Sequence, residues 1–112
     1  MKTPSLNRKL VLEAPERVAD GAGGYEITWT ALGTIWADIR PGSGREREVH
    51  SLPRSQVPLV VTLRAAPVGS DARPKAGQRF REGARIYNIN AVTEAADSRH
   101  YLLARVQEEV AA

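Results

Sequence analysis

The sequence predicts an all-β fold: a small single-domain β-barrel of about six or seven strands that carries one long mobile loop. Three observations predict this class. Apolar and polar residues alternate over short segments, glycine and proline separate these segments, and no long stretch has apolar residues at helical spacing. A barrel or sandwich is favoured because closure removes exposed strand edges. At 112 residues the chain can build one core, so residues 1–112 should form one domain.

Residues 9–14 are expected to form the first strand, with Leu10 and Leu12 on one face. Pro15 should end this strand, because proline removes a donor from the hydrogen-bond ladder. Residues 20–24, Asp-Gly-Ala-Gly-Gly, are typical of a hairpin turn in which glycines supply positive φ.

The segment after this turn has the period-two pattern of half-buried strands. Tyr25, Ile27 and Trp29 alternate with polar residues, so this aromatic face should point inward. A turn is expected at Leu32-Gly33. Residues 34–40 then form another strand, with Ile35, Ala37 and Ile39 on one face and Trp36 on the other.

Residues 41–56 have almost nothing to bury and cannot offset the entropy of ordering themselves, so a long mobile loop is expected. Loops of this length inside compact domains are uncommon and are usually functional or disordered. The candidate functional residues of this region are Arg40, Arg45, Glu46, Arg47, Glu48, His50 and Arg54.

The second half of the chain predicts further strands over residues 57–64, 78–81, 85–93 and 101–108, with a second loop over 66–76. Residues 57–64 show the clearest alternation, and Phe80 should point inward. The residues expected in the core are Leu10, Leu12, Tyr25, Ile27, Trp29, Ile35, Ile39, Leu59, Val61, Leu63, Phe80 and Ile89.

No pattern of catalytic, cofactor-binding or metal-binding residues is found. The glycines of residues 21–24 are not followed by Gly-Lys-Ser/Thr and open no helix, so they cannot form a P-loop. His50 and His100 have no partner at metal-ligand spacing, and the chain has no cysteine. We expect no enzyme and no cofactor.

The chain carries 16 basic and 13 acidic residues, and most of the basic ones are arginines in its central part. This pattern suits contact with phosphate or with a subunit of complementary charge. The arginines of residues 40–54 could become ordered on phosphate, or they could belong to a solvated loop in which Glu46 and Glu48 compensate them.

Targeting signals are not evident. No apolar run approaches the roughly 20 residues needed to cross a bilayer, and residues 1–8 lack the apolar core of a signal peptide. Residues 1–7 are expected to be a flexible terminus. The protein should stay in the compartment where it is synthesised, without a membrane partner.

The order of several segments along the chain resembles one known family. The succession is similar to the head-tail joining (head closure, or stopper) proteins of tailed phages and gene transfer agents, and its Arg/Ala-rich character is closest to the gene transfer agent versions. The segments that carry this resemblance are residues 6–15, 20–25 with Trp29, 35–46, 61–64, 79–81 and 85–89.

This resemblance implies a virion structural protein of the particle neck. It implies a small β-barrel that forms a homo-oligomeric ring of six copies, below the portal adaptor protein and above the tail terminator or tail tube protein. Double-stranded DNA would pass through the ring. In relatives the long loop points to the channel axis and can block DNA exit, which maps this role to residues 41–56. Its run of charges, residues 45–48, departs from an apolar plug.

Two alternatives remain open at this point. A free-standing nucleic-acid-binding barrel would use the central arginines, and it would bind DNA with a steep salt dependence as a purified monomer. A neighbouring neck component, such as a tail terminator, would have a similar β-rich composition.

Overall fold

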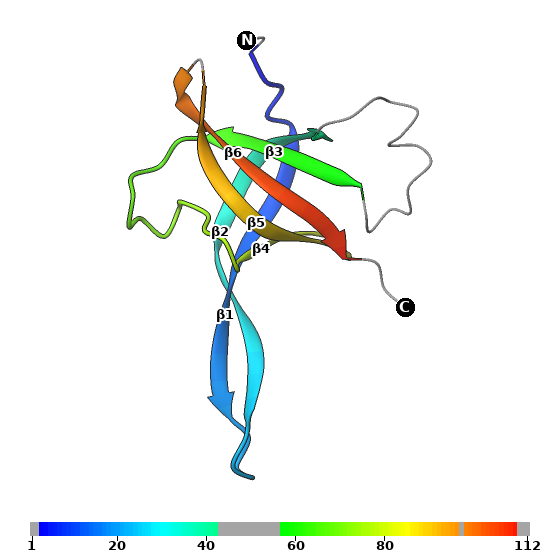
Figure 1. Ribbon diagram of the computed structural model, residues 1–112, viewed down its shortest axis with the longest axis vertical. Coiled ribbons are helices and arrows are strands. Elements are labelled where there is room, and N and C mark those ends of the chain that lie inside the picture. Colours follow the sequence, from blue (N-terminus) through cyan, green and yellow to red (C-terminus); the bar gives the residue numbers. More distant parts are fainter. Residues whose placement is uncertain (1–2, 43–56, 97, 110–112) are drawn as a thin grey trace.

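The protein, described here from a computed structural model, is built from antiparallel strands (Figure 1). The structure describes residues 3–42, 57–96 and 98–109, and no helix within these ranges could cross a membrane. The all-β prediction is confirmed. The described residues form six strands: β1 (Arg8–Ala19), β2 (Tyr25–Pro41), β3 (Pro58–Arg64), β4 (Arg79–Glu82), β5 (Arg85–Ala95) and β6 (Ser98–Glu109).

The strands pair in the order β1-β2-β3-β6-β5-β4, and β4 pairs back to β1. This return gives a closed hydrogen-bonding order, although β4 contacts β1 only from Val11 to Glu13. Because every strand has a neighbour on each side within the barrel, edges that could pair with other chains are removed there.

The core fills the inside of the barrel with alternate residues of the strands. Six of the residues expected there are buried: Leu10, Leu12, Val61, Leu63, Phe80 and Ile89. Ile35, Ile39 and Leu59 are partly buried and pack against this cluster. The cluster also contains Ala37, Tyr87, Leu102, Ala104 and Val106.

A β-bulge in β2 overturns the expectation for the aromatic segment. Leu12 pairs with Gly33 but Glu13 pairs with Ala31, so Leu32 is an extra residue in a continuous strand, and the predicted turn there is wrong. One extra residue moves every side chain before it to the opposite face.

The aromatic residues before the bulge therefore face outward. Tyr25 and Ile27 are 63% and 55% exposed, and Trp29 is half-buried, so none of the three lies in the core as expected. Beyond the bulge the expected faces hold: Ala37 points into the core and Trp36 is exposed.

β1 does not end at Pro15, which corrects a second expectation. β4 pairs with β1 only as far as Glu13, so Pro15 lies where β1 has β2 as its single neighbour. A missing N–H is tolerated at such a free edge. The strand continues to Ala19, and the outer parts of β1 and β2 extend from the barrel as a two-stranded ribbon (Figure 1).

We call this ribbon, residues 14–30, the arm. The hairpin turn predicted at its tip is confirmed: Gly21 and Gly23 have φ of 82° and 87°. Asp20 Oδ1 accepts hydrogen bonds from the backbone N–H groups of Ala22 and Gly24, at 2.8 and 3.1 Å. The arm makes the molecule elongated, with extents of 51 × 36 × 21 Å.

The segment expected to form the long loop is anchored at both ends by the sheet. β2 continues to Pro41, which pairs with Leu59, and the N–H of Gly42 donates to the carbonyl of Pro58 at 2.7 Å. Residues 43–56 lie outside the described residues. The second loop, residues 65–78, leads into β4 as expected.

Candidate assembly surfaces

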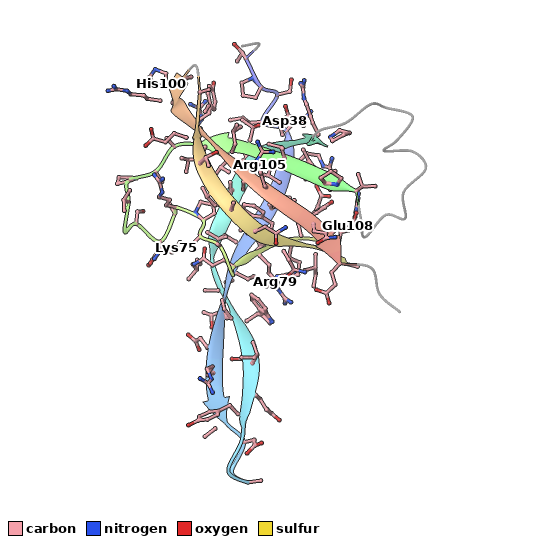
Figure 2. All side chains as sticks on the ribbon, in the orientation of Figure 1. Asp38, Lys75, Arg79, His100, Arg105 and Glu108 are labelled. Carbon is pink, nitrogen blue, oxygen red and sulfur yellow. The ribbon has the colours of Figure 1, made fainter. Side chains whose placement is uncertain are left out.

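A cluster of charged and aromatic side chains fixes the arm to the barrel. Glu13 receives hydrogen bonds from Arg79 Nε at 2.7 Å and from Arg81 Nε at 2.9 Å. The guanidinium of Arg79 also lies 4.0 Å from the ring centre of Trp29, at the point where the arm leaves the barrel (Figure 2). We call Glu13, Trp29, Arg79 and Arg81 the arm-base cluster. It joins β1, β2 and β4.

The arm-base cluster holds a buried carboxylate in its charged form. The side chain of Glu13 is 7% exposed, and burial by itself would raise its pKa. Hydrogen bonds from Arg81 and Arg79 act in the opposite direction, and the pKa of Glu13 is lowered below its ordinary value. The two arginines thus stabilise a charge that burial alone would disfavour.

A second cluster occupies the inside of the barrel at the end where β6 finishes (Figure 2). Arg8 donates to both carboxylate oxygens of Glu82, at 2.7 and 2.6 Å, and Arg85 donates to both oxygens of Glu108, at 2.8 Å each. The hydroxyl of buried Tyr87 donates to Glu82 at 3.2 Å. These two ion pairs cover one end of the apolar core, and their charged groups are hydrogen-bonded to each other.

The pKa directions agree with these contacts. The hydrogen bond from Arg8 lowers the pKa of Glu82, and the same contact raises the pKa of Arg8. Burial raises the pKa of Tyr87. The lowered pKa of Glu82 and the raised pKa of Arg8 keep both of these groups charged near neutral pH, and the raised pKa of Tyr87 keeps its hydroxyl protonated.

One face of the arm carries exposed apolar side chains around Arg17. Directly paired residues share a face, so the pairs Pro15–Trp29, Arg17–Ile27 and Ala19–Tyr25 lie on the side that continues the outer surface at Glu13. Arg17 lies over the ring of Tyr25 at 4.4 Å. We call this surface, residues Pro15, Ala19, Tyr25, Ile27 and Trp29, the apolar arm face.

A second apolar surface lies on the wall of the barrel. The outer face carries a row across four strands: Lys9 pairs with Trp36, Arg64 follows on β3, and Arg64 pairs with Tyr101 on β6. Trp36 is 53% exposed. It borders a groove between the barrel wall and the second loop, which we call the Trp36 groove. Its lining includes Leu6, Ile35, Trp36, Arg64, Ala66 and Ala72.

The residues expected to face a channel are only partly described. Arg40 is exposed at the end of β2, and its Nε donates to Asp38 at 2.9 Å. The remaining candidates lie outside the described residues, namely Arg45, Glu46, Arg47, Glu48, His50 and Arg54. His100 is exposed on β6, and the described part of the chain holds no group of three potential metal ligands.

Several central arginines have a role that the sequence did not reveal. Arg79, Arg81 and Arg85 pair with carboxylates of the same chain instead of presenting a continuous basic surface. Their partners Glu13 and Glu108 are distant in sequence and buried. The period-two pattern of β6 places Glu108 on the same inward face as Leu102, Ala104 and Val106, so the sequence did contain a signal for its burial. No pattern in the sequence indicated that Glu13 is buried.

Comparisons with known proteins agree over nearly the whole chain. The family model for phage head completion proteins matches residues 1–109. A chain from the virion of a native gene transfer agent particle is 49% identical, with 97% of this chain and 100% of that chain covered and a TM-score of 0.74. A Shigella flexneri 2a protein, 19% identical over 96% of each chain, has a similar fold with a TM-score of 0.67. The curated proteins gave no significant match.

Proposed function

The chain belongs to the phage head completion protein family, and from this membership we propose that it is a structural head-tail connector in the neck of a gene transfer agent or tailed-phage particle. One observation carries most weight: a chain 49% identical over its full length is part of a gene transfer agent virion. The role is structural and not catalytic. The partners are the portal adaptor above, the tail terminator or tail tube protein below, and the DNA that passes between them.

In this role the chain forms a closed ring, of six copies, around the DNA channel. Two features support assembly with other chains. The apolar arm face and the Trp36 groove both expose aromatic side chains, and exposed apolar patches of this kind mark interaction surfaces. The pairing of Arg79, Arg81 and Arg85 with carboxylates removes much of the basic surface that a free DNA-binding module would need.

Cryo-electron microscopy of the particle neck tests the connector directly. We expect density for this chain as a ring between the adaptor and the tail, with the barrel recognisable at the same position in every copy. Absence of the chain from purified, tailed particles would contradict the proposal and would favour a free nucleic-acid-binding barrel.

We propose further that residues 41–56 close the channel before the tail arrives. The support is that both ends of this segment are held by paired β2 and β3, so a ring would bring equal segments to one axis. Arg45, Glu46, Arg47 and Glu48 alternate in charge and could pair between neighbouring copies. A single exposed pair contributes about 0.2 to 1 kcal/mol, so repetition around the ring is needed for a stable gate.

Deleting residues 44–55 should leave the barrel folded but produce particles that lose DNA. The fold should survive because Gly42 and Pro58 remain hydrogen-bonded neighbours and the described core contains no residue of this segment. Nuclease-protected DNA per particle measures retention, and circular dichroism of the purified variant checks the fold. A matched control replaces residues 45–48 with a Gly/Ser sequence of equal length and separates charge from length. Wild-type retention in the deletion variant would reject the gate and leave a passive spacer.

A further inference from the structure

The two outer edges of the arm differ in how open they are to a further strand. Pro15 pairs with Trp29 in the non-hydrogen-bonded type, so the backbone groups of Trp29 point away from β1. By alternation the backbone groups of Ile27 and Tyr25 point the same way. Pro15 itself lies on the outer edge of β1, where it offers no N–H donor. Proline protects natural sheet edges against pairing, so the edge of β1 is blocked near its base.

The edge of β2 is long and open. β3 pairs with β2 only from Ala37 to Pro41, so β2 has a free edge over residues 25–35. No backbone group of this segment forms a hydrogen bond on that side with another described residue. The segment contains no proline and a single charge, Glu26, and most of its other residues are β-branched or aromatic. A row of unpaired N–H and C=O groups is a template for a strand from another chain.

A groove follows the inner part of this edge. The Trp36 groove and an adjoining hollow border β2 at residues 32–36. The second loop forms the other side of both through Ala72. The adjoining hollow has an apolar lining that includes Leu12, Leu32 and Ile35. Strand addition combines main-chain hydrogen bonds along an edge with hollows for alternate side chains, and this edge offers both.

The charges of the arm disfavour a second arm as the added strand. The pairs Glu16–Thr28 and Val18–Glu26 lie opposite to the apolar arm face, on a face with two carboxylates and no cation. Residues with outward backbone groups pair with one another, so the arms of two copies would pair with their acidic faces on the same side. Like charges on neighbouring strands repel. A strand with Lys or Arg on this side is attracted instead.

We infer that the free edge of β2, residues 25–35, binds an extended segment of a different protein, which adds to the arm as a further strand. Side chains of this segment alternate: apolar ones lie beside Ile27 and Trp29, and basic ones lie beside Glu26 on the opposite face. The inference rests on the proposed connector function, in which the different protein is another component of the neck. It identifies the edge and the kind of segment that join the two proteins.

A cryo-electron microscopy map of the neck that resolves the main chain tests this inference. We expect an extended segment of another protein along residues 25–35, hydrogen-bonded to their outward backbone groups, with Lys or Arg beside Glu26. Three results would overturn the inference and leave the connector role standing: an unoccupied edge, an edge paired with a second copy of this chain, or a segment without a basic residue beside Glu26. Absence of the chain from particles would reject both proposals.

Proline variants test the main-chain contact itself. Ala31 pairs with Glu13 in the same type as Trp29 with Pro15, so the N–H of Ala31 also points to the free edge. Ala31→Pro removes this donor without breaking a hydrogen bond inside the arm. Arg17→Pro is the matched control, because it removes an outward N–H from the edge of β1. We expect about tenfold fewer tailed particles from Ala31→Pro and a normal number from Arg17→Pro, because main-chain hydrogen bonds give strand addition its affinity.

Thermal unfolding of the purified variants checks that the barrel is intact. Normal tail joining by a folded Ala31→Pro, or an equal loss in Arg17→Pro, would contradict strand addition at β2. Ile27→Pro removes another outward donor farther from the barrel, directly opposite Arg17, and gives the same comparison if Ala31→Pro does not fold.

Discussion

Replacing Arg79 and Arg81 together by methionine should lower the free energy of unfolding at pH 7 by about 3 kcal/mol. Methionine keeps most of the side-chain volume, so the main change is that Glu13, 7% exposed, loses both of its cations. Removing the partners of a buried charge typically costs about 3 to 5 kcal/mol. We expect the lower part of this range because Arg81 is 41% exposed, and water already screens its contact. Urea unfolding followed by circular dichroism measures the change.

The pH dependence of this variant should be opposite in sign to that of the natural protein. In the natural protein the folded-state pKa of Glu13 is lowered. Its ionised form therefore adds to the free energy of unfolding above the unfolded-state pKa, and this addition is lost as pH falls through the folded-state pKa. Without the arginines only burial acts, and burial raises the folded-state pKa. The penalty in the variant should therefore shrink as acid protonates Glu13.

Two further variants isolate the buried charge. Adding Glu13→Gln to the double variant should recover much of the lost stability at pH 7, because the uncompensated charge is gone. Arg105→Met, at an exposed site without an ion pair to a described residue, should change stability by no more than about 0.5 kcal/mol. A double variant as stable as the natural protein at pH 7 would show that the arm-base cluster contributes no net stability.

Much of the barrel could be predicted from the sequence because local pattern and final structure agree there. β3 shows this best: Leu59, Val61 and Leu63 recur at every second position and lie on the inward face of the strand. The glycine turn at residues 20–24 was also predictable, since positive φ at Gly21 and Gly23 is a local requirement.

The arm could not be predicted, because its outward aromatic face has the same alternation as an inward one. Tyr25, Ile27 and Trp29 obey the period-two rule, and the bulge at Leu32 decides which side they take. A bulge depends on pairing with a distant strand, which local pattern does not reveal. The expectation that these residues lie in the core was therefore wrong.

The buried acids were missed for a related reason. Glu13 and Arg79 are 66 residues apart, and their contact exists only because β1 pairs with β4 at the end of the closed order. A sequence shows which charges are present but not which of them meet. Arginines that suggested a phosphate surface therefore proved to be structural partners of carboxylates at Glu13 and Glu108.

Shortening the arm should abolish the transfer of packaged DNA while leaving the barrel intact. Pro15 has no N–H to donate to β2, so its pair with Trp29 is of the non-hydrogen-bonded type. The next pair, Glu16–Thr28, is therefore hydrogen-bonded, and a two-residue hairpin turn can close a pair of this type. Replacing residues 17–27 by Asn-Gly then retains the arm-base cluster and removes Tyr25 and Ile27. None of the removed residues belongs to the core, so thermal unfolding should be nearly unchanged.

A matched pair of point variants shows whether the apolar arm face is responsible. Ile27→Asp places a charge on this face, whereas Thr28→Asp places the same charge one residue away on the opposite face. Both sites are exposed. Thr28→Asp lies opposite Glu16 and should lower stability slightly, whereas Ile27→Asp lies opposite Arg17 and should not. Only Ile27→Asp should give particles that fail to join tails and transfer DNA. Equal loss of transfer in both would attribute the effect to the acidity of the arm, and normal transfer in the shortened variant would mean that the arm is dispensable for assembly.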